Sequence, residues 1–472
     1  MTVRTRFAPS PTGYLHVGGI RTALFAYLVA RQAGGQFVLR FEDTDKKREV
    51  AGSAEHLIAS LKAIGIDYDE GPDIGGPYGP YIQSQRLERY RAVADQLVKE
   101  GRAYADPYTA QDMERFRAEA VAAKKPFLYR NHRPENPPVW DGSQPLRFKS
   151  DPKNYDWHDE VMGDMQVSPE VIDDFILLKS DGYPTYNFAH IIDDRDMAIT
   201  HIMRGQEFLS SMPNYLNLYE ALDIDLPVFA HLPHIMNEQG NKKLGKRDGA
   251  KDVLDYIRDG YLGEAMMSFI ATMGWNDGTE QEIFSREELV AKFSLGKVQR
   301  SGARFDEKRL LWVNGQFMRS LDLEDLYARS AQFWPAEAAD ATEDYRKQVL
   351  ALAQDRLKTL DDLRGFSYFF ANPSKNQSLI TDNKQLKKLE PSEIGQILQT
   401  AHTKLTAVEQ WDAAHLQQAL NELLEETGQR PGVLFSLIRI YTTWAPFSPE
   451  LAPTLALIGK AAVLDRLQIA NP

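Results

Sequence analysis

The sequence predicts an α/β fold: a core built on a parallel sheet, an insertion within that core, and an all-helical C-terminal third. Three observations predict it. Residues 2–45 follow the order strand, glycine-rich turn, helix, strand. Residues 101–179 lose this alternation and are crowded with prolines, whereas the pattern after residue 319 is almost wholly helical. At 472 residues the chain is long for one domain, and about three or four units are expected.

The first predicted unit is a crossover between two parallel strands. Residues 5–8 read as a buried strand that stops at the turn residues 9–13. Apolar residues at helical spacing follow, and a second strand over residues 37–41 delivers the acidic segment 42–45 at its carboxyl end. Because such crossovers are right-handed, both strand ends and the helix N-terminus face one crevice, where ligands bind in open α/β sheets. This is the arrangement of a Rossmann-type core.

The rest of the chain is predicted from its periodicity. Sheet-like patterning returns over residues 183–231. In the C-terminal third, leucines keep helical spacing over residues 416–424, and that helix is expected to stop at Gly428.

The composition is ordinary for a soluble globular enzyme, with 43% hydrophobic and 26% charged residues. The absence of cysteine excludes disulfides and a thiolate-ligated zinc. No apolar run approaches the roughly 20 residues of a membrane span, and no targeting segment is visible, which favours the cytoplasm. The net charge of −12 argues mildly against a nucleic-acid partner, but basic clusters within 46–48, 242–247 and 384–388 leave the partner open.

Residues 9–19 carry the strongest functional signal, a glycine-bearing turn that opens a helix. Gly18 and Gly19 let a triphosphate approach the backbone, and the N–H groups at the helix start favour anions. His16 can donate a hydrogen bond to a phosphate oxygen whose charge grows in the transition state. The run is neither the dinucleotide G-x-G-x-x-G pattern nor a P-loop. A lone histidine near a turn is more often structural, and only the full run favours a nucleotide site.

Two signatures resemble those of class I glutamyl-tRNA synthetases. Residues 6–19, Arg-Phe-Ala-Pro-Ser-Pro-Thr-Gly-Tyr-Leu-His-Val-Gly-Gly, resemble the first, and residues 40–45, Arg-Phe-Glu-Asp-Thr-Asp, resemble its companion segment. Residues 243–247, Lys-Leu-Gly-Lys-Arg, resemble the second signature, usually Lys-x-Ser-Lys-Arg in this family. Its lysines can follow the phosphates as pyrophosphate leaves. Gly245 replaces the usual serine and is expected to make closure of this loop less favourable.

The resemblance implies the site residues. The expected catalytic residues are His16, Gly18, Lys243 and Lys246. The expected ATP-binding residues are Pro9, Thr12, His16, Gly18, Gly19, Glu207, Ile235, Lys243, Leu244, Lys246 and Arg247. The expected glutamate-binding residues are Arg6, Ala8, Ser10, Glu42, Tyr186, His190 and Arg204. The planar fork of an arginine suits the side-chain carboxylate of glutamate, and an acidic side chain suits its α-ammonium group.

Two positions depart from the family's pattern. His190 stands where asparagine is usual, and it is expected to donate a hydrogen bond in its place. Gln206 stands where an acidic or small residue is usual.

The resemblance also implies the reaction. The α-carboxylate of glutamate attacks the α-phosphate of ATP, and the glutamyl group then moves to the terminal ribose of tRNA-Glu, at the 2′-hydroxyl first. No protein nucleophile is needed, because the enzyme supplies positioning and electrostatic stabilisation with Mg²⁺ as the counter-ion. Some members hold zinc through cysteines in the insertion, so none is expected in this cysteine-free chain. A monomer is the family expectation.

The expected domains follow the same resemblance. They are a Rossmann catalytic domain over residues 1–100 and 180–240, an inserted acceptor-stem-binding domain over 101–179, a stem-contact region with the mobile lysine loop over 241–318, and a helical anticodon-binding domain over 319–472. Arg356 matches the position that reads the third anticodon base as cytosine, and Arg439 is a candidate for the first base. For both, an ordinary surface arginine stays the alternative.

Other interpretations stay open. A glutaminyl-tRNA synthetase has a different first signature and a β-barrel C-terminus, a tRNA-modifying paralogue lacks the helical domain, and a cytidylyltransferase-like enzyme is far shorter. A degenerate paralogue that only binds tRNA is allowed by Gly245, but the retained His16, Lys243, Lys246 and Arg204 favour the enzyme. Whether tRNA-Gln is also charged stays open.

Overall fold

The computed structural model of the chain describes residues 2–245, 251–445 and 447–468. The chain forms two compact units, Met1–Tyr256 with Met266–Asp306 and Ile257–Ala265 with Glu307–Pro472. Within the described ranges, no helix combines the length and the apolar character needed to cross a membrane.

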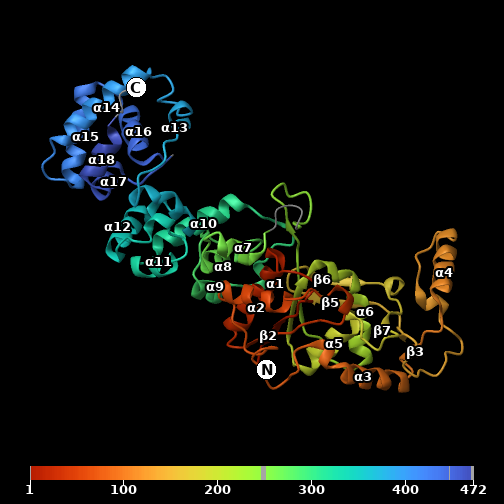
Figure 1. Cartoon of the computed structure of the whole chain (residues 1–472). Helices are drawn as coiled ribbons and strands as arrows, with labels where there is room; N and C mark the ends of the chain where they lie inside the picture. The colour runs from red at the N-terminus through yellow and green to blue at the C-terminus, as the bar shows by residue number, and fades with distance from the viewer. Residues whose placement is uncertain (1, 246–250, 446, 469–472) are drawn as a thin grey trace. The chain divides into compact units, whose positions relative to one another are not determined.

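The first unit is built on a six-stranded sheet (Figure 1). Its strands are β1 (Arg4–Phe7), β2 (Gln36–Leu39), β5 (Tyr155–Asp159), β6 (Gly163–Val167), β8 (His201–Gly205) and β9 (Val228–Leu232). The strand order is β2-β1-β8-β9-β5-β6, and every neighbouring pair is parallel except β5 with β6. Because β1 lies between β2 and β8, the carboxyl ends of these three strands open on one edge of the sheet, where α/β proteins bind their ligands.

The predicted crossover is present as β1, helix α1 (Val17–Gln32) and β2. All four residues of β1 are buried, as are Ile20, Leu24 and Leu28 of α1. Gly35 is needed where the chain returns beside β1, because a Cβ there would lie 2.1 Å from the carbonyl oxygen of Val3. The sequence-based prediction of an α/β core is confirmed.

The sheet-like reading of residues 183–231 was only partly correct. The segment contains β8 and β9, but two helices alternate with them, α5 (Tyr186–Asp196) and α6 (Met212–Ala221). Seven consecutive residues of α5, from Phe188 to Asp194, are buried. A helix that is covered on most sides has no polar stripe, so its sequence lacks the period that normally reveals a helix.

Residues 101–179 contribute to two different sheets. Strands β3 (Ala103–Ala105), β4 (Leu146–Phe148) and β7 (Ile176–Leu178) form an antiparallel sheet of their own, and helix α4 (Ala110–Ala122) lies beyond it (Figure 1). The β5–β6 hairpin instead joins the main sheet, because Asp159 of β5 pairs with Phe229 of β9. Part of the inserted segment therefore lies directly beside the strands of the core. The domain boundaries given above stay a prediction.

The remaining elements of the first unit surround the sheet. They are α2 (Ser53–Ala63), α3 (Leu87–Lys99), α9 (Arg286–Lys292) and the short parallel pair β10 (Ile235–Met236) and β11 (Ala303–Arg304). Helices α7 (Val253–Arg258) and α8 (Gly263–Ala271) each contain a boundary between the two units.

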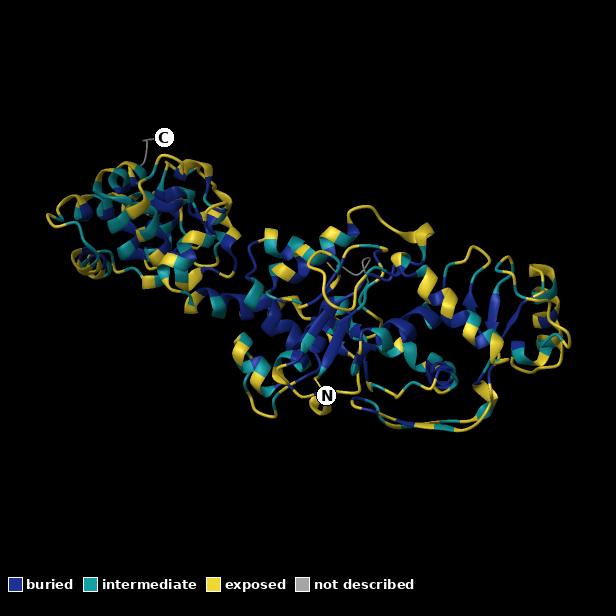
Figure 2. Cartoon of the chain, turned by 90° about the horizontal axis from the view of Figure 1, so that it is seen from below, coloured by how far each residue is buried: buried dark blue, intermediate teal, exposed yellow. Residues whose placement is uncertain are grey.

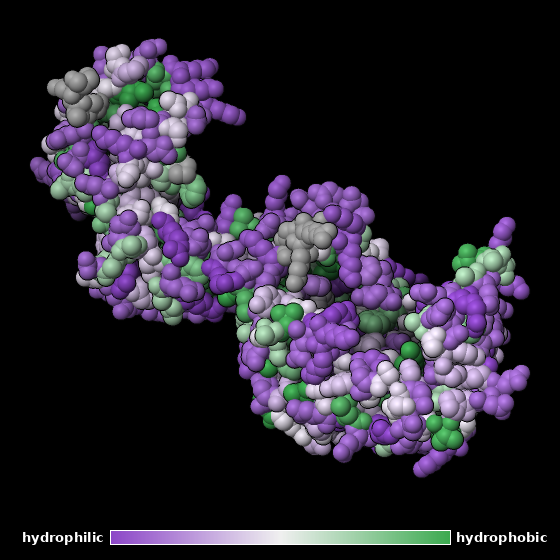
Figure 3. Space-filling view, turned by 45° about the vertical axis from the view of Figure 1, so that its right-hand side comes forward, coloured by the Kyte–Doolittle hydropathy of each residue, from purple (hydrophilic) through white to green (hydrophobic). Residues whose placement is uncertain are grey.

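The second unit is all-helical over its described residues, which confirms the predicted fold class of the C-terminal third. Its helices are α10 (Glu307–Ser320), α11 (Leu323–Arg329), α12 (Glu343–Ala353), α13 (Ser378–Thr381), α14 (Pro391–Thr406), α15 (Ala413–Thr427), α16 (Pro431–Thr443), α17 (Leu451–Ile458) and α18 (Lys460–Leu467). Leu416, Leu420 and Leu423 are buried in its core, and α15 ends at Gly428 in the left-handed conformation with φ of 63°, as predicted. The buried residues line the strands and inward helix faces of the first unit and the inward helix faces of the second (Figure 2). The face in Figure 3 is mostly hydrophilic.

Candidate active site

The N-terminus of α1 is capped by His16 itself. The backbone N–H of Gly18 donates to His16 Nδ1 at 3.0 Å. Because a backbone N–H can only donate, Nδ1 is unprotonated and Nε2 carries the ring proton, so the exposed imidazole presents an N–H donor. Gly18 is required by this contact, since a Cβ there would lie 2.9 Å from His16 Cε1. The capping geometry thus orients a hydrogen-bond donor at an anion-favouring helix end.

The neighbouring residues of this loop differ in their exposure. Thr12 and Ser10 are exposed, Pro9 and Ala8 are half-buried, and a Cβ on Gly19 would lie 2.5 Å from Leu15 Cδ1. A side chain at Gly19 would therefore have to displace Leu15, whereas the surface of the loop at Ser10 and Thr12 is open to solvent.

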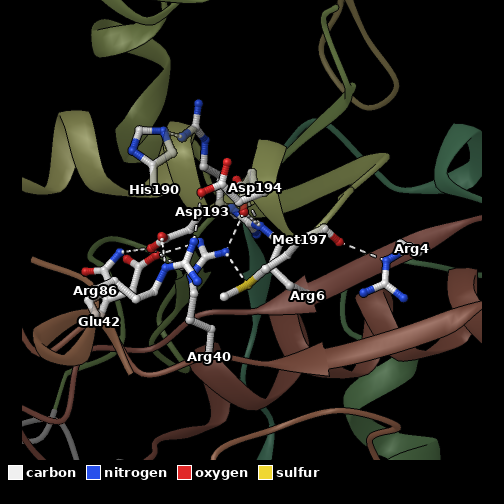
Figure 4. Close-up of polar contacts among 12 residues, drawn as sticks. Arg4, Arg6, Arg40, Glu42, Arg86, His190, Asp193, Asp194 and Met197 are labelled. Carbon is white, nitrogen blue, oxygen red and sulfur yellow. Dashed lines mark hydrogen bonds and ion pairs between the residues drawn. The ribbon is translucent and has the colours of Figure 1, made fainter. Parts of the chain in front are cut away.

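A buried ion network includes Arg6, on the strand that leads into this loop (Figure 4). Arg40 is fully buried and donates to Asp194 Oδ1 and Glu42 Oε1, both at 2.8 Å. Arg6 donates through Nε to the same Asp194 Oδ1 at 3.1 Å and through Nη1 to the carbonyl of Met203 at 3.2 Å. Asp193 lies 3.7 Å from Arg40 Nε. Two arginines and three carboxylates therefore share one enclosed cluster, and breaking one member leaves an uncompensated buried charge.

The cluster sets the ionisation of Glu42. Burial raises the pKa of Glu42 to about 7, against the opposing effect of the Arg40 and Arg6 charges and with a smaller contribution from Asp194. Asp194 behaves differently: burial would raise its pKa, but Arg6 and Arg40 lower it to about 2. Asp194 is therefore the permanent carboxylate of the cluster, and Glu42 is the one that titrates near neutral pH.

Arg204, on β8, is buried beside two histidines. Its Nε donates to His231 Nε2 at 3.0 Å, and its Nη1 lies 3.4 Å from His190 Nε2. Its guanidinium also lies 4.8 Å from the ring centroid of Tyr215. Within the part of the chain that the structure describes, no ion pair joins Arg204 to a carboxylate. A buried guanidinium held only by neutral groups is prepared to bind an anion.

His190 does not act as the sequence analysis expected. Its Nδ1 lies 2.7 Å from the carbonyl oxygen of Tyr186, so the single N–H of the neutral ring is donated there. Burial and the Arg204 charge lower the pKa of His190 to about 3, which keeps it neutral. Nε2 is then an acceptor for Arg204, and no ring N–H is left for a substrate.

Tyr186 links the two charged sites. Its ring stacks on His190, with the centroids 4.7 Å apart. Burial raises the pKa of Tyr186, Glu42 raises it further, and Arg204 lowers it. Tyr186 lines the same cleft as Glu42, and the His190 ring on which it stacks contacts Arg204.

An open cleft of about 460 Å³ reaches Glu42 and Tyr186 of this site. It is lined by Ser10, Glu42, Thr44, Asp45, Lys46, Lys47, Arg48, Lys179, Asp181, Tyr183, Pro184, Thr185 and Tyr186. The basic segment 46–48 and Lys179 are among these lining residues. The basic cluster that composition alone could not interpret thus lines the same cleft as Glu42.

The lysine loop begins on a short strand-like pair. Leu244 donates its backbone N–H to the carbonyl of the buried Ile235 at 2.8 Å. Lys243 Nζ lies 3.5 Å from Glu207 Oε1, and His234 Nδ1 lies 3.7 Å from the other oxygen of that carboxylate. Lys246 and Arg247 lie outside the described residues. Glu207, Ile235, Lys243 and Leu244 thus lie together, and their role in binding ATP stays a prediction.

Comparisons with known proteins give the family. A model described as "tRNA synthetases class I (E and Q), catalytic domain" matches residues 2–312, and one described as "Anticodon binding domain" matches residues 325–471. A protein of Clostridium botulinum named "Glutamate--tRNA ligase" is 38% identical over 476 residues, covering 99% of this chain and 97% of the relative. The chain belongs to the glutamate–tRNA ligase family.

Other members agree with this assignment. A relative of the same name from Dehalococcoides mccartyi is 38% identical over 477 residues, with 99% of this chain and 97% of the relative covered. The solved glutamate tRNA ligase of Elizabethkingia meningosepticum, in complex with its amino acid, has a TM-score of 0.87 at 32% identity and covers 99% and 98% of the two chains. The synthetase of Elizabethkingia anophelis has a TM-score of 0.86 at 32% identity and 99% coverage of both chains. The predicted resemblance is confirmed, and membership of this class implies the use of ATP.

The two candidate anticodon contacts of this family member lie in the second unit. Arg356 is exposed, and Arg439 is half-buried with its Nε donating to Ser448 Oγ at 2.9 Å. Burial lowers the pKa of Arg439, and the positive charge of Arg356 lowers it further. Arg356 and Arg439 are 83 positions apart in sequence, and the fold places them close enough for their charges to interact. Two positive charges that act on each other favour a polyanion as the ligand.

Sequence reasoning missed four residues around the site. Arg40 and Asp194 hold the network, and Asp159 and His231 lie behind Arg204. A signal was present for two of them: Arg40 and His231 each interrupt an apolar strand run, and a buried polar residue in such a run needs a partner.

Proposed function

We propose that this member of the family activates L-glutamate with ATP and transfers the glutamyl group to the 3′-terminal adenosine of tRNA-Glu. The observation that carries this proposal is the buried Arg204, held by His231 and His190, together with a cleft that Glu42 and Tyr186 line; Tyr186 stacks on His190. Arg204 would bind the side-chain carboxylate of glutamate, and Glu42 would bind its α-ammonium group. A glutamine side chain offers no charge to Arg204, so the site favours glutamate.

The remaining residues place ATP for the reaction. The α-carboxylate of the bound glutamate attacks the α-phosphate in line, and pyrophosphate leaves. The Nε2–H of His16 and the helix N-terminus that it caps would stabilise the phosphate charge, while Lys243 and Lys246 would follow the departing phosphates. Mg²⁺ is proposed to enter with ATP and to offset its phosphate charge.

The tRNA would contact both units. We assign the acceptor stem to residues 101–179 and 241–318, and the anticodon to residues 319–472. Arg356, which is exposed and lies near a second arginine, would read the third anticodon base as cytosine, and Arg439 would contact the first. We further propose that the enzyme is a monomer and acts in the cytoplasm.

Glutamate-dependent exchange of pyrophosphate into ATP tests this function. We expect exchange with glutamate and with tRNA-Glu bound, and little with glutamine. If no exchange occurs with or without tRNA, the chain is instead a degenerate paralogue that only binds tRNA.

A matched pair of variants tests the pocket. Arg204→Ala should abolish glutamate activation and leave the affinity for tRNA unchanged, because Arg204 is buried in the amino-acid site. Arg89→Ala is the control, since Arg89 is a half-exposed arginine of the same unit that pairs with Asp196. Equal activation by both variants removes Arg204 from the site.

A further inference from the structure

A row of hydrogen bonds leads from the β5–β6 hairpin to Arg204. Asp159 is the last residue of β5, and its Oδ2 lies 2.6 Å from Nδ1 of His231. His231 lies directly opposite Arg204 in the pairing of β8 with β9, and its Nε2 accepts from Arg204 Nε at 3.0 Å. Asp159 and His231 are both completely buried, and Arg204 is 4% exposed. The row is therefore closed to solvent and its geometry is fixed by strand pairing.

The donors and acceptors of the row define its protonation. Asp159 Oδ1 accepts the backbone N–H groups of Val161 at 3.0 Å and Met162 at 2.9 Å. Burial would raise the pKa of Asp159, but the hydrogen bonds from His231 and from the Met162 backbone lower it, so the carboxyl is ionised. It can only accept from His231, which places that ring's proton on Nδ1. His231 Nε2 is then a lone pair that accepts the Nε–H of Arg204. Burial lowers the pKa of His231, although its hydrogen bond to Asp159 opposes the shift, and the ring stays neutral.

Arg204 thus contacts a neutral acceptor at two of its nitrogens: Nε donates to His231, and Nη1 faces His190. A carboxylate in either place would fix the guanidinium equally well, but it would also cancel the positive charge that a substrate carboxylate needs. With imidazole acceptors, the arginine is oriented and its charge remains available. Asp159 fixes the tautomer of His231, the ring that lies between Asp159 and Arg204. Aspartates orient other functional histidines in the same way.

We propose that Asp159 and His231 are positioning residues that hold Arg204 with its charge uncompensated, and so set the preference of the site for a side-chain carboxylate over a carboxamide. This inference rests on the proposed binding of glutamate by Arg204. Neither residue touches the substrate. Both act through the orientation of the arginine.

The sharpest test is Asp159→Asn, which preserves shape. The asparagine oxygen is required by the backbone N–H groups of Val161 and Met162, so its NH₂ group must face His231 Nδ1. The ring proton then moves to Nε2, where it meets the N–H of Arg204, and two donors face each other. We expect the KM for glutamate in tRNA-dependent pyrophosphate exchange to rise about tenfold or more, since a hydrogen bond to a charged group is lost. The KM for ATP should stay within about twofold, and the preference for glutamate over glutamine should fall about tenfold.

Variants on the same hairpin and on His231 complete the series. Asp164→Asn makes the same chemical change on β6, at a side chain that is 95% exposed, and should behave as wild type. His231→Leu should reproduce Asp159→Asn, whereas His231→Gln keeps an acceptor near the position of Nε2 and should recover most of the glutamate affinity. An unchanged glutamate KM in Asp159→Asn, or an equal rise in the KM for ATP, overturns the proposal.

The tautomer can be measured without any variant. Long-range ¹H–¹⁵N NMR of the ¹⁵N-histidine-labelled wild-type chain should show His231 protonated at Nδ1, and an Nε2–H form overturns the proposal even if the variants fail to fold. Arg204→Ala distinguishes the proposed binding of glutamate by Arg204 from the positioning role of Asp159. If Arg204→Ala raises the glutamate KM and Asp159→Asn does not, only the positioning role fails; if Arg204→Ala has no effect, the assigned pocket fails with it.

Discussion

The ionisation of Glu42 makes glutamate binding sensitive to pH. Burial raises the pKa of this carboxyl to about 7, and only its ionised form attracts the α-ammonium group of glutamate. Lowering the pH protonates Glu42 and weakens glutamate binding, whereas raising the pH above the pKa of Glu42 has little further effect on that binding. For a pKa of about 7, the ionised fraction falls from about nine-tenths at pH 8 to about one-tenth at pH 6. The KM for glutamate should therefore rise roughly tenfold over that interval.

The assay is pyrophosphate exchange with saturating ATP and tRNA-Glu, in which the glutamate KM is measured across this pH range. The substrate's own side-chain carboxyl titrates near about pH 4.3 and does not interfere. Glu42→Gln is the matched control: it keeps the hydrogen bond to Arg40 available but cannot titrate, so its glutamate KM should be high and flat. A flat KM in the wild type contradicts the account, and so does a tenfold change that survives in Glu42→Gln.

Other predictions follow from single contacts. In Gly18→Ala, the added Cβ displaces His16. We expect kcat to fall about 10²-fold or more, as when an oxyanion donor is lost, and the glutamate KM to stay unchanged. A wild-type kcat in this variant excludes a catalytic role for the His16 cap. His190→Asn, which restores the family's usual residue, should keep activation within about threefold, and His190→Leu should raise the glutamate KM about tenfold, since it removes an acceptor from Arg204. Arg356→Ala should lower kcat/KM for tRNA-Glu about 10- to 100-fold, the range for one arginine–base contact, and equal charging by both proteins would assign Arg356 to the ordinary surface.

The parts of the site that sequence could predict are local. The His16 cap and the glycines that it needs lie within four residues of one another, so a short motif contains the whole geometry. Glu42 follows a predicted strand, and the rule that ligands bind at strand ends placed it correctly beside the loop. These predictions required no knowledge of the distant chain.

The parts that sequence could not predict depend on strand order. Asp159 and His231 are 72 positions apart, and they meet because β5 joins the main sheet beside β9, although it belongs to the inserted segment. The same holds for Arg356 and Arg439, which a helical fold brings together. The role of His190 was misread for a different reason: its N–H is used within its own helix by the carbonyl of Tyr186, a contact that a family pattern does not reveal.

The central claim is that this chain joins glutamate to tRNA-Glu. The direct measurement is the charging of purified tRNA-Glu and tRNA-Gln with labelled glutamate, side by side and with ATP. The account predicts that tRNA-Glu is charged and that tRNA-Gln is charged far more slowly, because Arg356 is assigned to cytosine at the third anticodon base. Failure to charge tRNA-Glu under conditions in which the chain binds it would contradict the account.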